Sequence, residues 1–551
     1  MLLLQASSIK KYYGDRLILG FDTLEIHSGD KIGVVGANGA GKTTLLQLLA
    51  GDIAPDEGAV TRRCPLSYIR QFADGSEAAS PVDRRALREL GLADKPRPPD
   101  ALSGGERTRL QIAAATGEQG LLLLADEPTA NLDMPGVELL TERLLACETL
   151  VLISHDRALL DRVCNKILEV SGGALHAYPG GYSDYEALRK QADARAWDDY
   201  EAYASERTRL ENALAERKSK ARKVKKAPSR MGNSEARLHR REATERSEKL
   251  NSAANAIQSR LDQLEVHEKP RELPQIKLDF SLTHPPASKN VLTGEHVRLA
   301  YGDNVLLADG SFIIPNRAKT ALVGPNGAGK TTLLNRVADG DETIRQATGV
   351  RLGLFRQDFD QLNADESVLQ NVLRGSVQSE MVARTILARL LLSAEDVHKP
   401  LRVLSGGERV KTAFAKLFVS DANVLLLDEP TNFLDIPAIE ALQTMLAKYE
   451  GTVLFVSHDR RFVDAVADRL LMLENGRLQS FTGNLTAYER RGSAPPSAVL
   501  REGERLRLQM RLTQLLARLD GCGANERQAL EDDYARMLEE LRKFEQNFDK
   551  A

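Results

Sequence analysis

An internal repeat constrains this 551-residue chain more than any other feature of its sequence. The segment GANGAGKTT at Gly36–Thr44 recurs as GPNGAGKTT at Gly324–Thr332, and LSGGER at Leu102–Arg107 recurs at Leu404–Arg409. An Asp-Glu-Pro-Thr segment and a Ser-His-Asp-Arg segment follow in the same order in both copies. The repeat predicts two copies of one α/β domain in a single polypeptide.

The spacing of the repeated segments shows where the two copies differ in length. The lysines of the glycine-rich segments are 288 residues apart, whereas the histidines of the Ser-His-Asp-Arg segments are 303 apart. Most of the difference arises between Gln71 and Ser103, which are 32 residues apart, while Gln357 and Ser405 are 48 apart. We expect the first copy to lack a helical piece that the second copy retains.

Each glycine-rich segment has the flanks of a phosphate-binding loop. A strand-like run precedes it (Lys31–Val35 and Thr320–Val323) and a helix-like run follows it. Glycine lets successive backbone N–H groups point at phosphate oxygens, and the N-terminus of the helix adds a favourable dipole. The sequence therefore predicts one nucleotide-binding loop in each copy.

Within these loops, the lysines are expected to reach the outer phosphates and the threonines after them to bind Mg²⁺. These residues are Lys42 and Thr43 in the first copy, and Lys330 and Thr331 in the second. The other loop residues expected to surround the phosphates are Gly36, Asn38, Gly39, Gly41, Thr44, Gly324, Asn326, Gly327, Gly329 and Thr332.

An apolar run in each copy ends in an Asp-Glu pair. The runs Leu121–Leu124 and Val424–Leu427 have the composition of strands buried on both faces. Open α/β sheets bind their ligands at the carboxyl ends of such strands. Phosphoryl transfer depends mainly on positioning and charge neutralisation. We expect the aspartates to bind Mg²⁺ directly or through water, and the glutamates to align the attacking water as general bases: Asp126, Asp428, Glu127 and Glu429.

A histidine follows a further apolar run in each copy. His155 comes after Leu150–Ile153 and His458 after Val453–Val456. The repeated Ser-His-Asp-Arg context favours contact with the terminal phosphate over the role of a buried core histidine. A serine-hydrolase triad is excluded, because adjacent residues on one turn cannot converge as those three roles require.

These motifs, in this order, resemble the ATP-binding-cassette (ABC) superfamily, and the resemblance covers both copies. The LSGGE motif separates this superfamily from other proteins with phosphate-binding loops. The resemblance implies that the LSGGE motif of one cassette covers ATP held by the other, so that two composite Mg²⁺–ATP sites form, and neither lacks a catalytic residue. It further implies that the serines and glycines of the LSGGE motifs contact ATP: Ser103, Gly104, Gly105, Ser405, Gly406 and Gly407. Gln71 and Gln357 would contact Mg²⁺, and Tyr13 and Tyr301 would stack on adenine.

The segment between the cassettes, from about Tyr182 to Val266, has a different pattern. It predicts two long polar helices with a break at Ala227–Ser234, where Pro228 ends the first helix. The leucine-rich spacing of the second helix is that of a coiled-coil seam. A turn centred near residues 230–231 would place Tyr203 near Ile257 and Trp197 opposite Leu264. A first helix of about 40 residues would be about 60 Å long.

Positive charge is concentrated at the far end of this predicted hairpin. Arg217–Lys226 has seven basic residues in ten, and Arg217–Lys249 has 13 Lys and Arg against four Glu, in a chain of net charge −3. Such a run favours contact with a phosphate backbone. The tip carries no aromatic residue for base stacking, which favours recognition of folded RNA by shape and charge.

Two cassettes joined by a long hairpin, with no membrane segment, resemble the ABC-F family of translation-associated ATPases. Tyr182-Ser183-Asp184-Tyr185 after Gly180-Gly181 is similar to that family's entry into its linker. The resemblance implies a bacterial ribosome as partner, with the hairpin in the exit site and its tip directed toward the peptidyl-transferase centre. The tip residues expected to contact large-subunit rRNA, P-site tRNA or the drug site are Lys225, Lys226, Ala227, Pro228, Ser229, Arg230, Met231, Gly232 and Asn233.

Two departures from housekeeping ABC-F members narrow the resemblance. The short interval after Gln71 leaves no room for the arm that many of them insert there. Ala130-Asn131 and Asn432-Phe433 replace their common Asn-His pair. Together with the tip sequence, these features resemble the antibiotic-resistance (ribosomal protection) branch, which displaces drugs and leaves the ribosome on ATP hydrolysis. As the drugs against which the chain would protect, the resemblance implies lincosamides, pleuromutilins and streptogramin A compounds ahead of phenicols and oxazolidinones.

The expected organisation is a first cassette over residues 1–181, a linker over 182–289, a second cassette over 290–490 and a helical extension over 491–551. The extension is either a solvated appendage or a further ribosome contact. With no apolar run of membrane-spanning length, no signal peptide and four scattered cysteines, we expect a soluble cytoplasmic monomer.

Three alternatives stay open from the sequence. A general ABC-F translation factor that rescues stalled ribosomes has the same organisation. A tandem ATPase subunit of a membrane importer has two cassettes but no evident use for a basic hairpin. A chromosome- or repair-type ATPase also uses coiled coils, although these usually interrupt a cassette rather than separate two whole ones.

Overall fold

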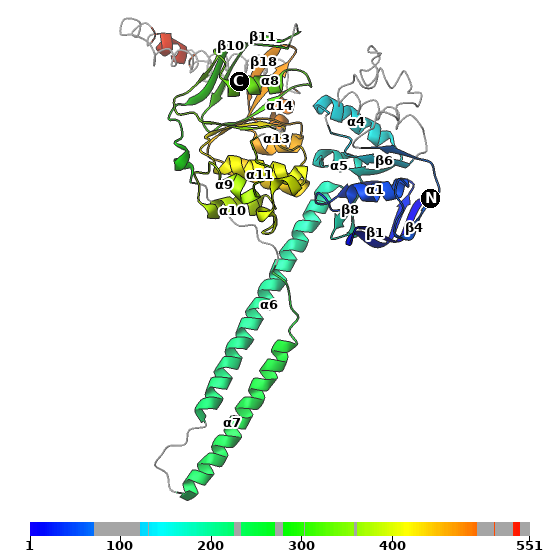
Figure 1. Ribbon diagram of the computed structural model, residues 1–551, viewed down its shortest axis with the longest axis vertical. Helices are drawn as coiled ribbons and strands as arrows, with labels where there is room; N and C mark the ends of the chain where they lie inside the picture. The colour runs from blue at the N-terminus through cyan, green and yellow to red at the C-terminus, as the bar shows by residue number, and fades with distance from the viewer. Residues whose placement is uncertain are drawn as a thin grey trace. The chain divides into compact units, whose positions relative to one another are not determined.

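The computed structural model describes residues 1–70, 122–130, 132–224, 233–269, 279–301, 304–356, 361–492, 512, 530 and 533–539. They form two compact units (Figure 1). The first consists chiefly of Met1–Asn131 and Gly136–Lys277, and the second chiefly of Leu278–Ala383 and Glu395–Ala551. Each unit holds one copy of the repeat, which confirms the predicted tandem α/β architecture.

The main sheet of the first unit has six strands in the order β5-β6-β7-β3-β8-β9. Neighbouring strands are parallel, except that β9 is antiparallel to β8. Every residue of β6 and β7 is buried, which explains why their sequences are continuously apolar. The strands are β5 (Leu66–Ile69), β6 (Leu122–Asp126), β7 (Thr149–Ile153), β3 (Lys31–Val35), β8 (Lys166–Ser171) and β9 (Ala174–Pro179).

A smaller antiparallel sheet lies on the other side of helix α1 (Lys42–Ala50). It consists of β2 (Arg16–His27), β1 (Leu2–Tyr13) and β4 (Glu57–Arg62), in that order. Four leucines of α1 are buried in one core with residues of both sheets. The helix that follows the phosphate-binding loop is therefore held from two sides, and the position of the loop is fixed by the main core of the unit.

The second unit repeats this plan. Its main sheet has the order β14-β15-β16-β12-β17-β18 and its smaller sheet the order β11-β10-β13, with α8 (Lys330–Asp339) in the place of α1. The main strands are β14 (Leu352–Phe355), β15 (Val424–Asp428), β16 (Thr452–Val456), β12 (Lys319–Val323), β17 (Arg469–Glu474) and β18 (Arg477–Thr482). The others are β11 (Asn304–Pro315), β10 (Asn290–Tyr301) and β13 (Ile344–Gln346).

The longer interval of the second copy is helical, as its length predicts. It contains α9 (Val368–Leu373) and α10 (Glu380–Arg389), followed by α11 (Gly406–Val419). The corresponding residues of the first copy, 71–121, lie outside the described residues. The predicted loss of a helical piece there stays a prediction.

Short helices follow the later strands of both units. In the first unit these are α4 (Met134–Ala146) and α5 (Arg157–Val163). In the second they are α12 (Ile436–Lys448), α13 (Arg460–Val466) and α14 (Leu485–Gly492). Of the predicted helical extension over 491–551, residues 491–492, 512, 530 and 533–539 are described, all of them as helix. None of the helices described in any part of the chain is long and apolar enough to cross a membrane.

Two long helices leave the first unit and run antiparallel beside each other (Figure 1). They are α6 (Tyr182–Val224) and α7 (Asn233–Asp262). The 43 residues of α6 correspond to a length of about 65 Å at the α-helical rise. The predicted hairpin is confirmed. The tip residues 225–232 lie outside the described residues, and Asn233 begins α7.

The register at the base of the hairpin differs from the predicted one. The ring of Tyr203 contacts His267 at 6.1 Å between ring centroids, and the Lys269 ammonium lies 5.7 Å from the centroid of Trp197. Both partners come later in the chain than the predicted Ile257 and Leu264. The offset is already present within the helices, because Arg260 of α7 lies 3.7 Å from Glu206 of α6 and comes later in the chain than a turn centred at residues 230–231 would place it.

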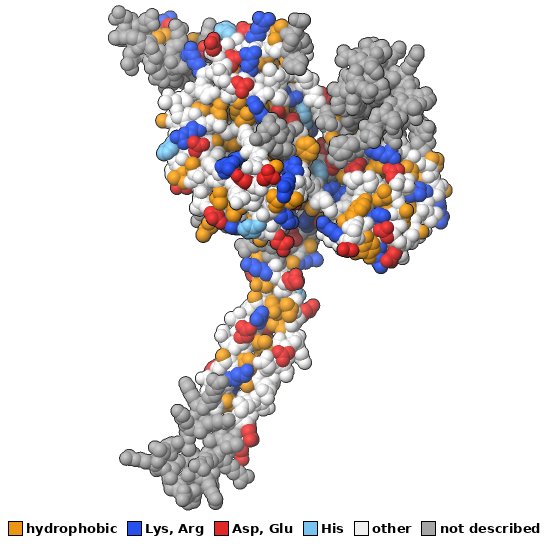
Figure 2. All heavy atoms as spheres, in the orientation of Figure 1, with side chains coloured by type: hydrophobic (Ala, Val, Ile, Leu, Met, Phe, Trp, Pro, Cys, Tyr) orange, Lys and Arg blue, Asp and Glu red, His pale blue; other side chains and the backbone are white. Residues whose placement is uncertain are grey.

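The shaft of the hairpin carries both signs of charge (Figure 2). Arg207 binds Glu211 at 2.9 Å and Arg209 binds Glu206 at 2.8 Å. Lys220 pairs with Glu216 in the same way. These exposed pairs along one helix contribute little stability, but they leave the described part of the shaft electrostatically balanced.

One buried side chain connects three segments of the second unit. Asn423, 1% exposed, donates from Nδ2 to the carbonyls of Thr283 at 3.1 Å and Gly349 at 2.9 Å. Its Oδ1 accepts from the backbone N–H of Arg351 at 2.9 Å. The asparagine thereby joins the end of the linker to two neighbouring strands at the base of the main sheet.

We predict that Asn423→Ala lowers the free energy of unfolding of the second unit by about 2–4 kcal/mol, because it leaves several buried backbone groups unpaired. Chemical denaturation of the full chain measures the effect. Gln479→Ala, at an exposed strand position, serves as the control and should stay within about 0.5 kcal/mol of the parent. Equal effects of the two substitutions would contradict the structural role of Asn423.

Candidate ATP sites

The first phosphate-binding loop lies between β3 and α1. Lys42, the first residue of α1, is 8% exposed and donates from Nζ to the carbonyls of Gly36 at 2.8 Å and Ala37 at 3.1 Å. Gly41, before the helix, has φ of 103°, which is strained for any other residue. A Cβ on Gly36 would come within 2.5 Å of the Val170 carbonyl oxygen of β8. The glycines therefore permit both the curl of the loop and its close approach to the sheet.

The second loop has the same geometry. Lys330 donates from Nζ to the carbonyls of Gly324 at 2.8 Å and Pro325 at 3.0 Å. A Cβ on Gly324 would lie 2.2 Å from the Leu473 carbonyl oxygen of β17. Burial lowers the pKa of Lys330, although nearby carboxylates oppose this change. Each loop is therefore built around a buried lysine whose ammonium group is hydrogen-bonded to loop carbonyls.

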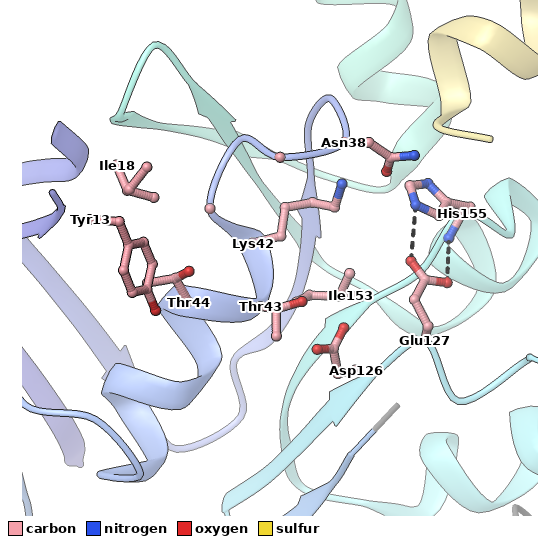
Figure 3. A pocket seen from close by; sticks show the side chains of 12 residues that line it. Tyr13, Ile18, Asn38, Lys42, Thr43, Thr44, Asp126, Glu127, Ile153 and His155 are labelled. Atoms are coloured by element: carbon pink, nitrogen blue, oxygen red, sulfur yellow. Dashed lines mark hydrogen bonds and ion pairs between the residues drawn. The ribbon is translucent and has the colours of Figure 1, made fainter. Parts of the chain in front are cut away.

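An aspartate lies beside the loop threonine in both copies. Burial raises the pKa of Asp126 from 3.8 to about 6, and a side-chain hydrogen bond with Thr43 opposes the shift. Burial also raises the pKa of Asp428, which is hydrogen-bonded with Thr331. Hydroxyl and carboxylate oxygens are the protein ligands that suit Mg²⁺. The strand ends and helix starts thus bring together, in each copy, a pair of residues that fits this ion (Figure 3).

The next residue of each strand end has an unusual backbone conformation. Glu127 and Glu429 have φ of 49° and 48°, in the left-handed region that non-glycine residues rarely adopt. Their backbone N–H groups donate to the carbonyls of Ile153 at 2.9 Å and Val456 at 3.0 Å on the neighbouring strand. Such strain is found mainly at functional sites, and here it turns the chain sharply where the strand ends.

Each glutamate is paired with the predicted histidine (Figure 3). His155 Nε2 lies 3.2 Å from Glu127 Oε1, and the His155 backbone N–H donates to Glu127 Oε2 at 3.3 Å. In the second copy, the corresponding distances between His458 and Glu429 are 3.3 and 3.4 Å. This pairing was not predictable from the sequence, since the two residues are 28 or 29 positions apart.

Burial determines the charge state of these pairs. It raises the pKa of both Glu127 and Glu429 from 4.5 to about 7 and lowers the pKa of His458 to about 4. The second pair is therefore a neutral imidazole beside a carboxyl group that titrates near neutral pH, and not a full ion pair. Oε1 of each glutamate is buried and accepts no hydrogen bond from the described residues. An acceptor of this kind fits a bound water molecule.

The aspartate that follows each histidine is a helix cap. Asp156 Oδ1 accepts from the backbone N–H groups of Ala158 at 2.9 Å and Leu159 at 3.0 Å, at the start of α5. Asp459 accepts in the same way at the start of α13. These bonds satisfy the N–H groups of the first helical turn. They agree with the exclusion of a serine-hydrolase triad.

A single pocket of the first unit collects most of the site residues predicted there (Figure 3). Tyr13, at the end of β1 and 54% exposed, lies in it together with the loop, the acid pair and the histidine. Ile18, which was not predicted as a site residue, also lines this pocket. It lies beside the loop, since its Cγ2 would be 2.9 Å from a Cβ on Gly41. The pocket is lined by Tyr13, Ile18, Asn38, Gly39, Gly41, Lys42, Thr43, Thr44, Asp126, Glu127, Ile153 and His155.

The second LSGGE motif begins a helix. The Ser405 hydroxyl accepts from the backbone N–H of Glu408 at 3.4 Å, and the Glu408 carboxylate accepts from the Ser405 N–H at 2.8 Å. This capping box starts the 14-residue helix α11, with Gly406 and Gly407 in its first turn. A Cβ on Gly406 would meet no atom within 4 Å. The motif thus presents open backbone at the positive end of a helix dipole.

Some predicted site residues cannot be placed. Gln71, Ser103, Gly104, Gly105 and Gln357 lie outside the described residues, as does the side chain of Tyr301. Their predicted contacts with ATP and Mg²⁺ stay predictions.

Comparison with known proteins agrees with this geometry. Residues 21–130 and 307–432 match the ABC transporter family, and residues 168–251 match a second family that is also described as ABC transporter. The fold resembles the archaeal ribosome recycling factor aABCE1, crystallised with the stalk protein aP1. The TM-score is 0.57 at 20% identity, over 86% of this chain and 90% of that one. At this identity the likeness concerns the fold alone.

Curated relatives are similar over most of their length. The erythromycin resistance ATP-binding protein MsrA of Staphylococcus epidermidis is 33% identical over 84% of this chain and 96% of its own. The ribosome protection protein VmlR of Bacillus subtilis is 29% identical, over 95% and 94%. The putative ATP-binding protein YdiF of the same species is 30% identical, over 89% and 82%.

The paired loops, acids and histidines define an ATP-hydrolysing enzyme with two ABC cassettes. The chain belongs to the ABC-F family. Its similarity to MsrA and VmlR confirms the predicted resemblance to the antibiotic-resistance type.

The buried glutamates predict a pH dependence of stability without nucleotide. Their pKa in the folded chain, about 7, exceeds their ordinary value of 4.5, so their contribution is complete below pH 4.5 and is lost as the pH rises through 7. Replacing both with glutamine removes this loss. We predict that Glu127→Gln with Glu429→Gln unfolds like the parent near pH 4, but is more stable by about 1–3 kcal/mol at pH 8.

Denaturant titrations at several pH values, without nucleotide, measure this difference. Exposed glutamates provide the control, because Glu211→Gln with Glu216→Gln should show no such gain at pH 8. If the free energies of unfolding of the parent and the double glutamine variant differ by the same amount from pH 4 to pH 8, burial does not raise the pKa of these glutamates.

Proposed function

We propose that the chain is a ribosome-binding ATPase that protects the ribosome from antibiotics. ATP closes the two cassettes, the tip of the hairpin displaces drugs at or near the peptidyl-transferase centre, and hydrolysis releases the protein. The observation that carries the proposal is the 43-residue helix α6 and its partner α7, placed between two complete cassettes. Nucleotide sites alone give no reason for a hairpin of this length.

The chemistry rests on two composite sites, each with Mg²⁺–ATP. Mg²⁺ supplies neutralisation of phosphate charge, and the Thr–Asp pair next to the buried glutamate fits this ion and the attacking water. The first site would combine its loop with the opposite signature motif: Lys42, Thr43, Gln71, Asp126, Glu127, His155, Ser405 and Gly407. The second would combine Lys330, Thr331, Gln357, Asp428, Glu429, His458, Ser103 and Gly105.

Within each site, the lysine binds the outer phosphates and the glutamate accepts a proton from the attacking water. A pKa near 7 is well matched to this task at neutral pH. The histidine lies against the glutamate and is placed to donate to the terminal phosphate of bound ATP. Tyr13, at the rim of the first pocket, stacks on adenine, and Tyr301 does so in the second site.

The proposed partner is the bacterial ribosome, bound by one copy of the chain whose two cassettes pair with each other. Two relatives are named for antibiotic resistance or ribosome protection, and the sequence of the tip region has nine more basic than acidic residues. The described shaft is balanced by its own ion pairs, so the excess of positive charge belongs to the far end of the hairpin. There it fits binding to rRNA or tRNA phosphates.

We predict that Glu127→Gln with Glu429→Gln traps the chain on ribosomes in the presence of ATP, since binding persists while hydrolysis stops. Sedimentation of ribosomes with the full chain measures the complex. Lys42→Ala with Lys330→Ala, which removes the phosphate contacts, is the control and should stay in the supernatant. A double glutamine variant that remains free of ribosomes with ATP present would overturn the proposed partner.

Removing the tip should separate resistance from hydrolysis. With Ala227–Gly232 replaced by a short Gly-Ser turn, we predict that inhibitory concentrations return to those of cells without the protein, while ATPase activity is kept. The assay is expression in a susceptible bacterium, with ribosome-targeting drugs of several classes, erythromycin and lincosamides among them.

Arg207→Gln with Arg209→Gln, on the balanced shaft, is the matched control and should keep resistance. Equal loss of resistance and ATPase activity in the tip variant would argue against a role of the tip. No protection against any drug by the parent, together with ATP-dependent ribosome trapping, would favour the alternative of a general translation factor.

A further inference from the structure

The start of α6 is hydrogen-bonded to the helix that follows the site histidine. Ser183 donates to the Asp161 carboxylate from its backbone N–H at 2.6 Å and from its hydroxyl at 2.7 Å. Asp161 lies in α5, near its C-terminal end. One carboxylate thus holds both donors of a residue in the first turn of the hairpin.

The other end of α5 belongs to the ATP site. Asp156 caps the helix, and the residue before it, His155, lies against Glu127. From Asp156 to Asp161 the helix rises only about 7.5 Å. Any displacement of the histidine segment therefore reaches the base of the hairpin through a single short helix, without an intervening loop.

A second set of contacts joins α6 to strand β8. Arg189 lies 3.4 Å from the Glu169 carboxylate and donates to the Tyr185 hydroxyl at 2.8 Å. Tyr178 donates to the same carboxylate at 3.2 Å, and its ring meets that of Tyr185 edge-on at 5.0 Å between centroids. Tyr185 is only 3% exposed. The cluster fixes the second turn of α6 by charge, hydrogen bonds and ring packing together.

Strand β8 also leads to the ATP site. Glu169 is followed by Val170, whose carbonyl oxygen is the atom that a Cβ on Gly36 would strike at 2.5 Å. Gly36 is the first glycine of the phosphate-binding loop. The base of the hairpin is therefore attached at two points, one to each of the elements that contact the nucleotide site.

The second cassette serves as an internal comparison, because it has no hairpin attached. At an offset of 303 residues, Asp464 accepts from the N–H of Thr486 at 2.8 Å and from its hydroxyl at 2.7 Å, at the start of α14. The ring pair also recurs, between Phe481 and Tyr488. The Glu169–Arg189 pair does not recur, because Met472 and Gly492 occupy its positions; α14 is instead joined to α13 by an ion pair between Arg460 and Glu489.

We propose that Asp161 and the Glu169–Arg189 pair are positioning residues that attach the hairpin rigidly to the first ATP site, so that nucleotide bound there orders the base of α6. The repeated Asp–hydroxyl contact serves any helix that leaves a cassette. The Glu169–Arg189 pair, which joins the exiting helix to strand β8, is found where that helix is 43 residues long. The inference rests on the proposed ATP cycle but not on the ribosome as partner.

Hydrogen exchange of the full chain, with and without a non-hydrolysable ATP analogue and Mg²⁺, tests the proposal. The backbone N–H groups of residues 182–190 report on the base of α6, and those of α1 report on nucleotide binding. In the parent chain, the analogue should slow exchange at both. In Asp161→Ala or Arg189→Met, it should slow exchange at α1 only.

Asp464→Ala removes the same contact in the cassette without a hairpin and is the matched control: slowing at residues 182–190 should persist. Ser183→Ala, which keeps the N–H bond and loses the hydroxyl bond, should give an intermediate effect even if Asp161→Ala folds poorly. Persistent slowing in all first-cassette variants would overturn the proposal, as would its absence in the parent or an equal loss in Asp464→Ala. The assay contains no ribosome, so its outcome is independent of the proposed partner.

Discussion

The parallel pairing of the central strands is the constraint on which both ATP sites depend. In the first unit, β6 pairs with β7 and β7 with β3, in registers that bring Asp126, Ile153 and Val35 to one edge of the sheet. The acid pair, the histidine and the phosphate-binding loop each follow one of these strand ends. They meet because the hydrogen-bond ladder leaves their strands no other alignment. The second unit repeats the ladder with β15, β16 and β12.

Burial of that edge gives the site its electrostatic character. It raises the pKa of Glu127 and Glu429 to about 7 and lowers the pKa of Lys330. Charging these buried side chains is costly, and the opposite charges of Mg²⁺ and the phosphates compensate that cost. Nucleotide therefore replaces missing interactions, which is a physical reason for ATP to order its surroundings. The contacts at the base of α6 lie within reach of this change.

Much of the site was predictable from spacing alone. Strands were expected at Lys31–Val35 and at the run before Asp126, and the structure has β3 and β6 there, because a short continuous apolar run is typical of a strand buried on both faces. The pairing of Glu127 with His155 was not predictable, since a bond between residues 28 apart depends on the register of two strands. The register of the hairpin was misplaced for a related reason: it depends on how two long helices pack, as the contact of Arg260 with Glu206 shows.

The sequence by itself determined the repeat, the chemistry of its loops and the presence of a long basic hairpin, because each is written in contiguous residues with a local period. Only the tertiary structure decided which side chains meet. It gave Glu127 its left-handed backbone, paired Glu127 with His155, and joined Ser183 to Asp161 across 22 positions. These contacts depend on the packing of whole strands and helices, and no local pattern in the chain encodes that packing.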